Sequence, residues 1–186
     1  MIARLSLVLC AALLSACQQE SAALPDPVDV TAEAAGYYCQ MALLEHDGPK
    51  GQIHLDGMPA PLFFSQVKDA VAYLHMPEQS HAVVATYVQE MSTGTWEEPG
   101  PWVEVSEAVY VIGSDMMGGM DAPEFVPFAM RAAAEAFAAR HGGEIRAFDA
   151  ITAQDVLGAP DAGAQAAQGE DDIAARLNAL TSYKGQ

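Results

Sequence analysis

The chain has 186 residues, 51% of them hydrophobic, which excludes an intrinsically disordered protein and leaves room for one domain or two small ones. Its 25 acidic residues outnumber 8 basic ones and give a formal net charge of -17. This balance argues against binding to nucleic acid or to anionic lipid surfaces, because both require basic patches. It fits simple solubility, attraction of cations or docking on a basic partner.

The N-terminus has the pattern of a lipoprotein signal peptide over residues 1–16. Arg4 precedes an apolar run, and Leu14-Ser15-Ala16-Cys17 is the motif at which such peptides are cleaved and the new N-terminal cysteine is acylated. We therefore predict that Cys17 carries a lipid anchor in the membrane. Gln18 is not the aspartate that signals inner-membrane retention, so we expect a periplasm-facing lipoprotein of the outer membrane.

The rest of the chain divides into four predicted parts. Residues 17–34 lack hydrophobic periodicity and contain prolines, so they are predicted to be the lipid anchor and a tether. Residues 35–92 and 93–158 are each predicted to form a β-β-α-β unit, which makes the fold α+β with two units in tandem. Residues 159–186 are predicted to be a loosely ordered tail with one short helix at 173–180.

Hydrophobic periodicity predicts the individual elements. Ser65 is the expected N-cap of the first helix, and Pro77 is its expected stop. The predicted strands span residues 37–41, 52–55, 61–64, 81–90, 102–105, 108–112, 125–128 and 144–148, and the predicted helices span 66–76 and 130–140.

Cys39 is the first candidate for chemistry. Once Cys10 leaves with the signal peptide and Cys17 is acylated, Cys39 is the remaining thiol of a protein in an oxidising compartment. On a strand, Cys39 and Met41 would point to one face with their Cα atoms about 7 Å apart. A thiolate with a thioether favours Cu(I) over Zn(II), so both residues are predicted Cu(I) ligands. Alternatively, Cys39 is a small buried hydrophobic residue beside a core methionine.

A second candidate is the segment Asp115-Met116-Met117-Gly118-Gly119-Met120-Asp121. Three methionines in five residues, interrupted by a glycine pair that disfavours both helix and strand, predict a flexible loop. Loop methionines are poorly explained as core, although methionine can fill an irregular gap. We predict that Met120, and after it Met117, supplies a thioether to the metal.

The histidines are weaker candidates for a metal site, and enzyme motifs are absent from the sequence. His46 follows the Cys39 segment closely enough to fold back onto the site, although a turn residue is the simpler interpretation. His141 is placed at a predicted helix C-terminus, where it suits the helix dipole. The sequence contains no nucleophile elbow, phosphate-binding or dinucleotide glycine loop, zinc-protease motif or Cys-x-x-Cys pair, so we expect no enzyme. The acidic residues are interpreted as a solvated surface.

Several of these motifs occur together, in the same order, in a known family. The sequence resembles the NosL family of nitrous oxide reductase accessory lipoproteins over the lipobox and about residues 36–157. The motifs that carry the resemblance are Tyr37-Tyr38-Cys39-x-Met41, Glu45-His46-x-Gly48-Pro49-Lys50-Gly51-Gln52-Ile53, Phe64-Ser65-Gln66-Val67-Lys68-Asp69-Ala70, Ala85-Thr86-Tyr87-Val88, Gly113-Ser114-Asp115 with Gly118-Gly119-Met120, Val126-Pro127-Phe128, the segment Phe137 to Gly143, and Phe148-Asp149. One difference is Gln40, where the family usually has glycine between Cys and Met.

The resemblance implies an envelope Cu(I) chaperone that delivers copper for the catalytic cluster of nitrous oxide reductase. It also implies a fold related to organomercurial lyase and sulfur ligands at Cys39, Met41 and Met120. A membrane transporter complex is a further expected partner. Two other classes are weighed against this one: a lipoprotein scaffold without metal, and a thiol-dependent carbon–metal lyase.

Overall fold

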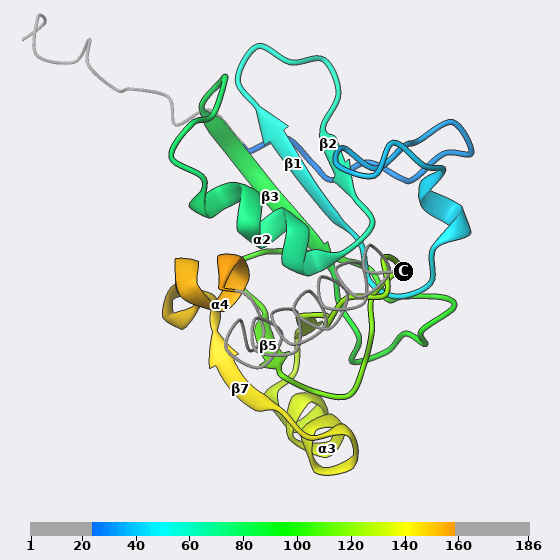
Figure 1. The fold of residues 1–186 in the computed structure, drawn as a ribbon. Helices are drawn as coiled ribbons and strands as arrows, with labels where there is room; N and C mark the ends of the chain where they lie inside the picture. Colours follow the sequence, from blue (N-terminus) through cyan, green and yellow to red (C-terminus); the bar gives the residue numbers. More distant parts are fainter. Residues whose placement is uncertain (1–23, 159–186) are drawn as a thin grey trace, which may run out of the picture.

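The computed structural model describes residues 24–158, which form two small antiparallel sheets with helices packed against them (Figure 1). The predicted signal peptide, the predicted acylation site Cys17, and the predicted C-terminal tail with its helix at 173–180 lie outside these residues. Over the part of the chain that is described, no helix combines the length and the apolar character needed to cross a bilayer.

The first sheet has the strand order β2-β1-β3-β4, and all neighbouring strands are antiparallel. Its helix α2 joins β2 to β3. The strands are β1 (Gly51–Leu55), β2 (Leu62–Phe64), β3 (Val83–Gln89) and β4 (Trp102–Glu104), and the helix is α2 (Val67–His75). Because β4 follows the predicted boundary at residues 92 and 93 yet pairs with β3, the first sheet extends past that boundary.

The second sheet has the order β6-β5-β7, again fully antiparallel, and helix α3 joins β6 to β7. The elements are β5 (Val109–Ile112), β6 (Val126–Phe128), α3 (Arg131–His141) and β7 (Glu144–Ala147). The second sheet thus has the element order β-β-α-β, with β5 in the middle, whereas the first sheet has the order β-β-α-β-β because β4 is added at its edge. Pro127, which has no N–H to donate, lies on the edge strand β6, as expected of a strand proline.

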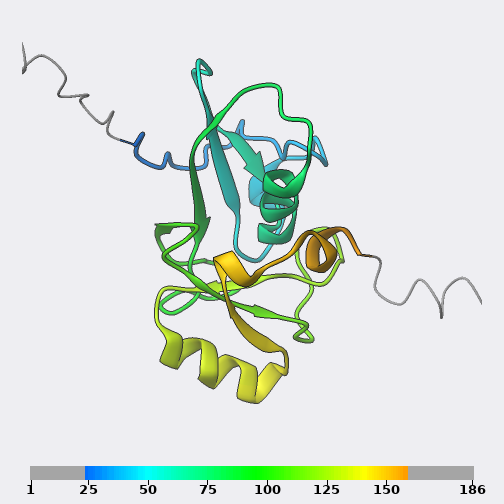
Figure 2. The ribbon, with the colours of Figure 1, turned by 90° about the vertical axis from the view of Figure 1, so that its left-hand side faces the viewer.

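Three short helices complete the described chain: η2 (Leu43–Glu45), η3 (Phe148–Ala150) and α4 (Ala153–Leu157). Thr152 and Asp155 form a capping box that starts α4. Figure 2 shows η3 and α4 between the two sheets, and α4 packs against α2. The closing helix therefore connects the second half of the chain to the first.

One core cluster contains residues of both halves. Val67 and Val71 of α2 and Val88 of β3 pack with Tyr110 of β5 and with Ile151. Two of these residues, Val67 and Val71, have the helical spacing predicted from the sequence. The mixed helix and strand architecture confirms the α+β fold class.

The segment before the first sheet is attached to that sheet. The side chain of Gln52, fully buried in β1, accepts a hydrogen bond from Val28 N and donates one to Val28 O, both at 3.0 Å. Tyr87 of β3 donates its hydroxyl to Pro25 O at 2.8 Å. Successive β1 side chains alternate between faces, so the segment covers the face opposite Ile53, whose side chain packs with Ala70 of α2.

Candidate metal centre

Cys39 lies in a tight turn, and the predicted strand over residues 37–41 is wrong. Gly36 N donates to Met41 O at 3.0 Å, and Gln40 N donates to Gly36 O at 2.8 Å, which closes the chain on itself. An isolated antiparallel bridge between Ala35 and Ala42 flanks the turn. The apolar–polar alternation was too short to extend a strand against these local hydrogen bonds. Cys39 and Met41 are consequently not neighbours on one face of a strand.

Gln40 has the backbone angle that glycine usually takes at such a turn. Its φ is 56°, in the left-handed region. Its side-chain amide donates to Tyr37 O at 2.7 Å and to Gly36 O at 3.4 Å, which offsets part of the steric cost. The left-handed backbone at residue 40 explains why glycine suits this position. This chain makes the same turn with glutamine.

The thiol of Cys39 lies over Gly36 and beside the start of α2. Its Sγ is 3.7 Å from Ser65 Oγ, and a Cβ added at Gly36 would lie 2.4 Å from Sγ. The side chain is half-buried. Ser65 does not cap α2, contrary to the prediction: the N-cap is Gln66, without a side-chain cap, and the Ser65 hydroxyl contacts the thiol instead.

Three aromatic side chains form a cluster beside this turn. The rings of Tyr37 and Tyr38 lie 5.3 Å apart, and both pack against Phe64, at 5.8 Å and 5.4 Å. Burial, followed by the negative charge of Asp69, raises the pKa of Tyr38. The two tyrosine rings give the turn an apolar flank, although each is still more than two-fifths exposed.

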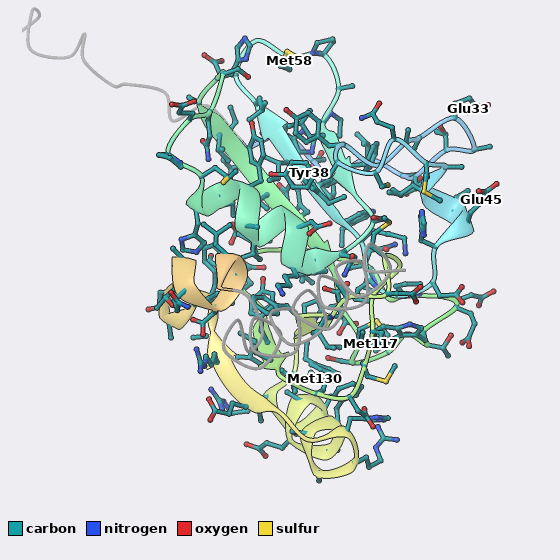
Figure 3. The ribbon with its side chains drawn as sticks, viewed as in Figure 1. Glu33, Tyr38, Glu45, Met58, Met117 and Met130 are labelled. Atoms are coloured by element: carbon teal, nitrogen blue, oxygen red, sulfur yellow. The ribbon has the colours of Figure 1, made fainter. Side chains whose placement is uncertain are left out.

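The three predicted thioether ligands all reach the surface. Met41, Met117 and Met120 are 46%, 45% and 41% exposed, whereas Met116 packs against the core between the second sheet and α3. In Figure 3, Met58 lies at the far end of the first sheet, between β1 and β2, well away from Met117. Exposed methionines are poorly placed for core packing and accessible to a soft metal ion.

The methionine loop, residues 113–125 between β5 and β6, is closely packed at its glycine pair. Gly118 N donates to Ala122 O at 2.8 Å and Asp121 N to Gly118 O at 3.0 Å, closing the tip. A Cβ at Gly118 would lie 2.5 Å from Gln66 Nε2, and one at Gly119 would lie 2.5 Å from His46 Cβ. The glycine pair therefore permits close approach; neither residue has a positive φ.

His46 is the predicted residue whose place is most informative. It follows η2 and packs on Gly119, so the structure brings it to the methionine loop. Its Nε2 is buried and finds no hydrogen-bond partner among the described residues. A buried imidazole nitrogen without a partner is costly, and a metal ion is one way to satisfy it. This orphaned atom fits a bound metal better than a simple turn residue does.

Two acidic residues contradict the interpretation of a wholly solvated acidic surface. Glu90 and Glu124 are 2% and 1% exposed. Burial raises the pKa of Glu124 to about 8, although hydrogen bonds from the backbone amides of Lys68, Phe125 and Val67 lower it. Sequence periodicity did not single out Glu124, because its partners in α2 lie more than fifty residues earlier; its place just before the apolar 125–128 segment was the one local signal.

The candidate donors at this surface are one thiol, three thioethers and one imidazole: Cys39, Met41, Met117, Met120 and His46. The contacts connect the Cys39 turn to Ser65, the adjacent Gln66 to the methionine loop, and that loop to His46. Within residues 24–158, no three His, Cys, Asp or Glu side chains gather as a metal-binding group. A metal at this surface would depend on sulfur.

Comparison with known proteins finds relatives that are named for copper binding. The NosL family model matches residues 27–156. The copper-binding lipoprotein NosL of Achromobacter cycloclastes is 47% identical over 189 residues, which cover 98% of each chain. The copper-binding lipoprotein NosL of Stutzerimonas stutzeri is 30% identical over 118 residues, 62% of this chain and 60% of the relative.

The fold also matches that of a solved structure. The crystal structure of the copper chaperone NosL from Shewanella denitrificans superposes with a TM-score of 0.64 at 29% identity, and the match covers 68% of this chain and 96% of that one.

Proposed function

The chain belongs to the NosL family, and from that membership we propose that it is a Cu(I) metallochaperone that a lipid on Cys17 anchors in the cell envelope. The relatives quoted above are named as copper-binding or chaperone proteins and not as enzymes, so the expectation of a non-enzymatic protein is confirmed. The observation that carries the copper proposal is the orphaned His46 Nε2 against the loop of exposed methionines.

The donor chemistry supports Cu(I) as the cargo. Thiolate and thioether sulfur are soft ligands and select the soft Cu(I) ion, whereas Zn(II) prefers thiolate, imidazole and carboxylate. We assign Cys39 as the thiolate and Met120, Met117 and Met41 as thioether donors, with His46 as a nitrogen donor.

Exposure of the donors supports delivery rather than storage. Each of the three methionines is more than two-fifths exposed, so a ligand of a receiving protein can approach copper before the chaperone ligands leave. We propose nitrous oxide reductase as the receiver, with a membrane transporter complex as the second partner. The proposed setting is the periplasmic side of the outer membrane.

The test is a Cu(I) titration of the protein starting after Cys17, against a chromophoric competing chelator. We expect one tight equivalent in the wild type, its loss in Cys39→Ser and a weaker affinity in Met120→Leu, because each variant removes one sulfur ligand. Met58→Leu is the matched control: Met58 is 44% exposed but lies at the far end of the first sheet (Figure 3).

Two results would contradict the site. Unchanged affinity in Cys39→Ser would mean that the thiol is not a ligand. An equal loss in Met58→Leu and Met120→Leu would mean that methionine content, not this loop, determines binding. A copper-free, disulfide-linked homodimer would favour the scaffold without metal.

A further inference from the structure

Glu124 is a buried carboxylate that the copper chemistry does not require. It precedes β6 and is 1% exposed. Its Oε1 accepts hydrogen bonds from Lys68 N at 2.9 Å and Phe125 N at 2.8 Å, and its Oε2 accepts one from Val67 N at 3.2 Å. Val67 and Lys68 are the first two residues of α2. A side chain from the methionine loop thus caps the helix of the other sheet, which has no side-chain cap of its own.

The same end of α2 touches both parts of the candidate metal centre. Ser65 Oγ is 3.7 Å from Cys39 Sγ, and Gln66 Nε2 donates to Ala122 O in the methionine loop at 3.4 Å. Four consecutive residues, 65–68, therefore contact the thiol, the loop backbone and the Glu124 carboxylate in turn.

The tip of the methionine loop packs directly against Glu124 and Gln66. A Cβ at Gly118 would lie 2.6 Å from Glu124 Oε2 and 2.5 Å from Gln66 Nε2, so the space between them admits no methyl group. Gly118 is flanked by Met117 on one side and is two residues from Met120. The position of both thioethers therefore depends on where Glu124 holds the loop.

We infer that Glu124 is a positioning residue, which fixes the Met117–Met120 tip to the start of α2 and so presents the thioethers toward Cys39 and His46; this inference rests on the copper function proposed above. A carboxylate suits the role because its two oxygens accept all three amide hydrogens. The isosteric glutamine has one accepting oxygen, and its NH₂ group would face a backbone donor. Outer residues that orient ligands in this way affect metal affinity without touching the metal.

A residue that serves stability alone would behave differently, and Glu90 provides the comparison. Glu90 is 2% exposed and accepts hydrogen bonds from Ser92 N, Thr93 Oγ1 and Ala129 N. None of these partners belongs to the Cys39 turn or the methionine loop. Glu124→Gln and Glu90→Gln therefore make the same isosteric change at two buried positions, and they differ in contact with the loop.

The first measurement needs no metal. Methionine methyl NMR of the copper-free protein should show the Met117 and Met120 signals moving toward those of an unstructured peptide in Glu124→Gln and staying in place in Glu90→Gln. Gln66→Leu, which removes only the bond to Ala122, should move the same two signals by a smaller amount and provides the test if Glu124→Gln does not fold.

The second measurement is Cu(I) affinity by chelator competition, with the sulfur count from X-ray absorption. Glu124→Gln should bind Cu(I) about 10–100-fold more weakly and with fewer sulfur ligands, as typical for loss of an orienting partner. Glu90→Gln should match the wild type in both respects, even where it unfolds at a lower temperature.

Unchanged methionine signals in both Glu124→Gln and Gln66→Leu would overturn the inference while leaving the copper function intact. Wild-type affinity and sulfur count in Glu124→Gln would do the same. If the wild type binds no Cu(I), or binds it no more tightly than Cys39→Ser does, the proposed function itself would be contradicted, whatever the loop signals show.

Discussion

The thiol of Cys39 takes the space that a side chain at residue 36 would fill. A Cβ at Gly36 would lie 2.4 Å from Sγ, and the next nearest atoms, in Leu43 and Ser65, are at 3.8 Å. The φ of Gly36 is not in the left-handed region, so an alanine meets no backbone penalty there. Glycine is required at this position because of the thiol and not because of the turn.

Gly36→Ala should therefore displace the thiol while the fold remains. We expect a loss of Cu(I) affinity and a changed rate of thiol modification by an aromatic disulfide reagent, with a stability cost of about 1–3 kcal/mol for overpacking. Gly57→Ala is the control, because no atom lies near its Cβ but its φ is +72°. That variant should lose stability through backbone strain and keep wild-type thiol reactivity. Equal thiol reactivity in all three proteins would contradict the argument.

At the scale of elements, the turn between η2 and β1 contains a buried lysine. Lys50 is 5% exposed and its Nζ donates to Gly48 O. Burial lowers its pKa from 10.5 to about 8, and the negative charges of Glu124 and Asp47 only partly oppose the change. The folded state therefore favours the neutral amine more strongly than the unfolded state does.

The lowered pKa of Lys50 determines how the free energy of unfolding depends on pH. Above pH 10.5 both states hold neutral Lys50; as the pH falls through 10.5 toward 8, the unfolded state gains the proton first and the folded state loses stability. The free energy of unfolding should thus rise by about 3 kcal/mol between pH 8 and pH 10.5, relative to Lys50→Met. Denaturant titrations of both proteins across this range measure the difference, and parallel pH profiles would show that Lys50 is charged when folded.

Local sequence patterns predicted most of the helices and strands, but not the contacts that join distant residues. Strands β1, β2 and β5 and both main helices lie within two residues of their predicted ranges, because hydrophobic periodicity records burial on one face. The Cys39 turn, the cap from Glu124 and the packing of Gly118 and Gly119 were missed. The cap and the glycine packing depend on partners in other elements, which a periodic pattern does not contain, and the Cys39 turn is closed by its own backbone hydrogen bonds. The candidate donors were chosen by residue type, and their arrangement was not predicted.

At the scale of the molecule, the N-terminal segment limits how far the body extends from its proposed lipid anchor. Among the described residues, Pro25 is the first with a hydrogen bond to the sheet, through Tyr87. Cys17 and Pro25 are eight residue steps apart, and at 3.3–3.6 Å per step these span about 28 Å at most. Were the segment released, the next attachment would be Ala34, which accepts a hydrogen bond from Leu43 N at 2.9 Å. The longest reach would then be about 60 Å.

Gln52→Leu should release this segment. The variant removes both hydrogen bonds with Val28 from a fully buried position, which corresponds to a local loss of about 1–3 kcal/mol. The Val28 amide should consequently exchange its hydrogen faster, while the β1 amides, bonded to β2 and β3, keep their protection. Gln89→Leu is the control, because Gln89 accepts a hydrogen bond from Lys50 N and does not bond to the segment. Equal Val28 protection in the wild type and Gln52→Leu would mean that Tyr87 alone holds the segment, and the shorter reach would then persist in both proteins.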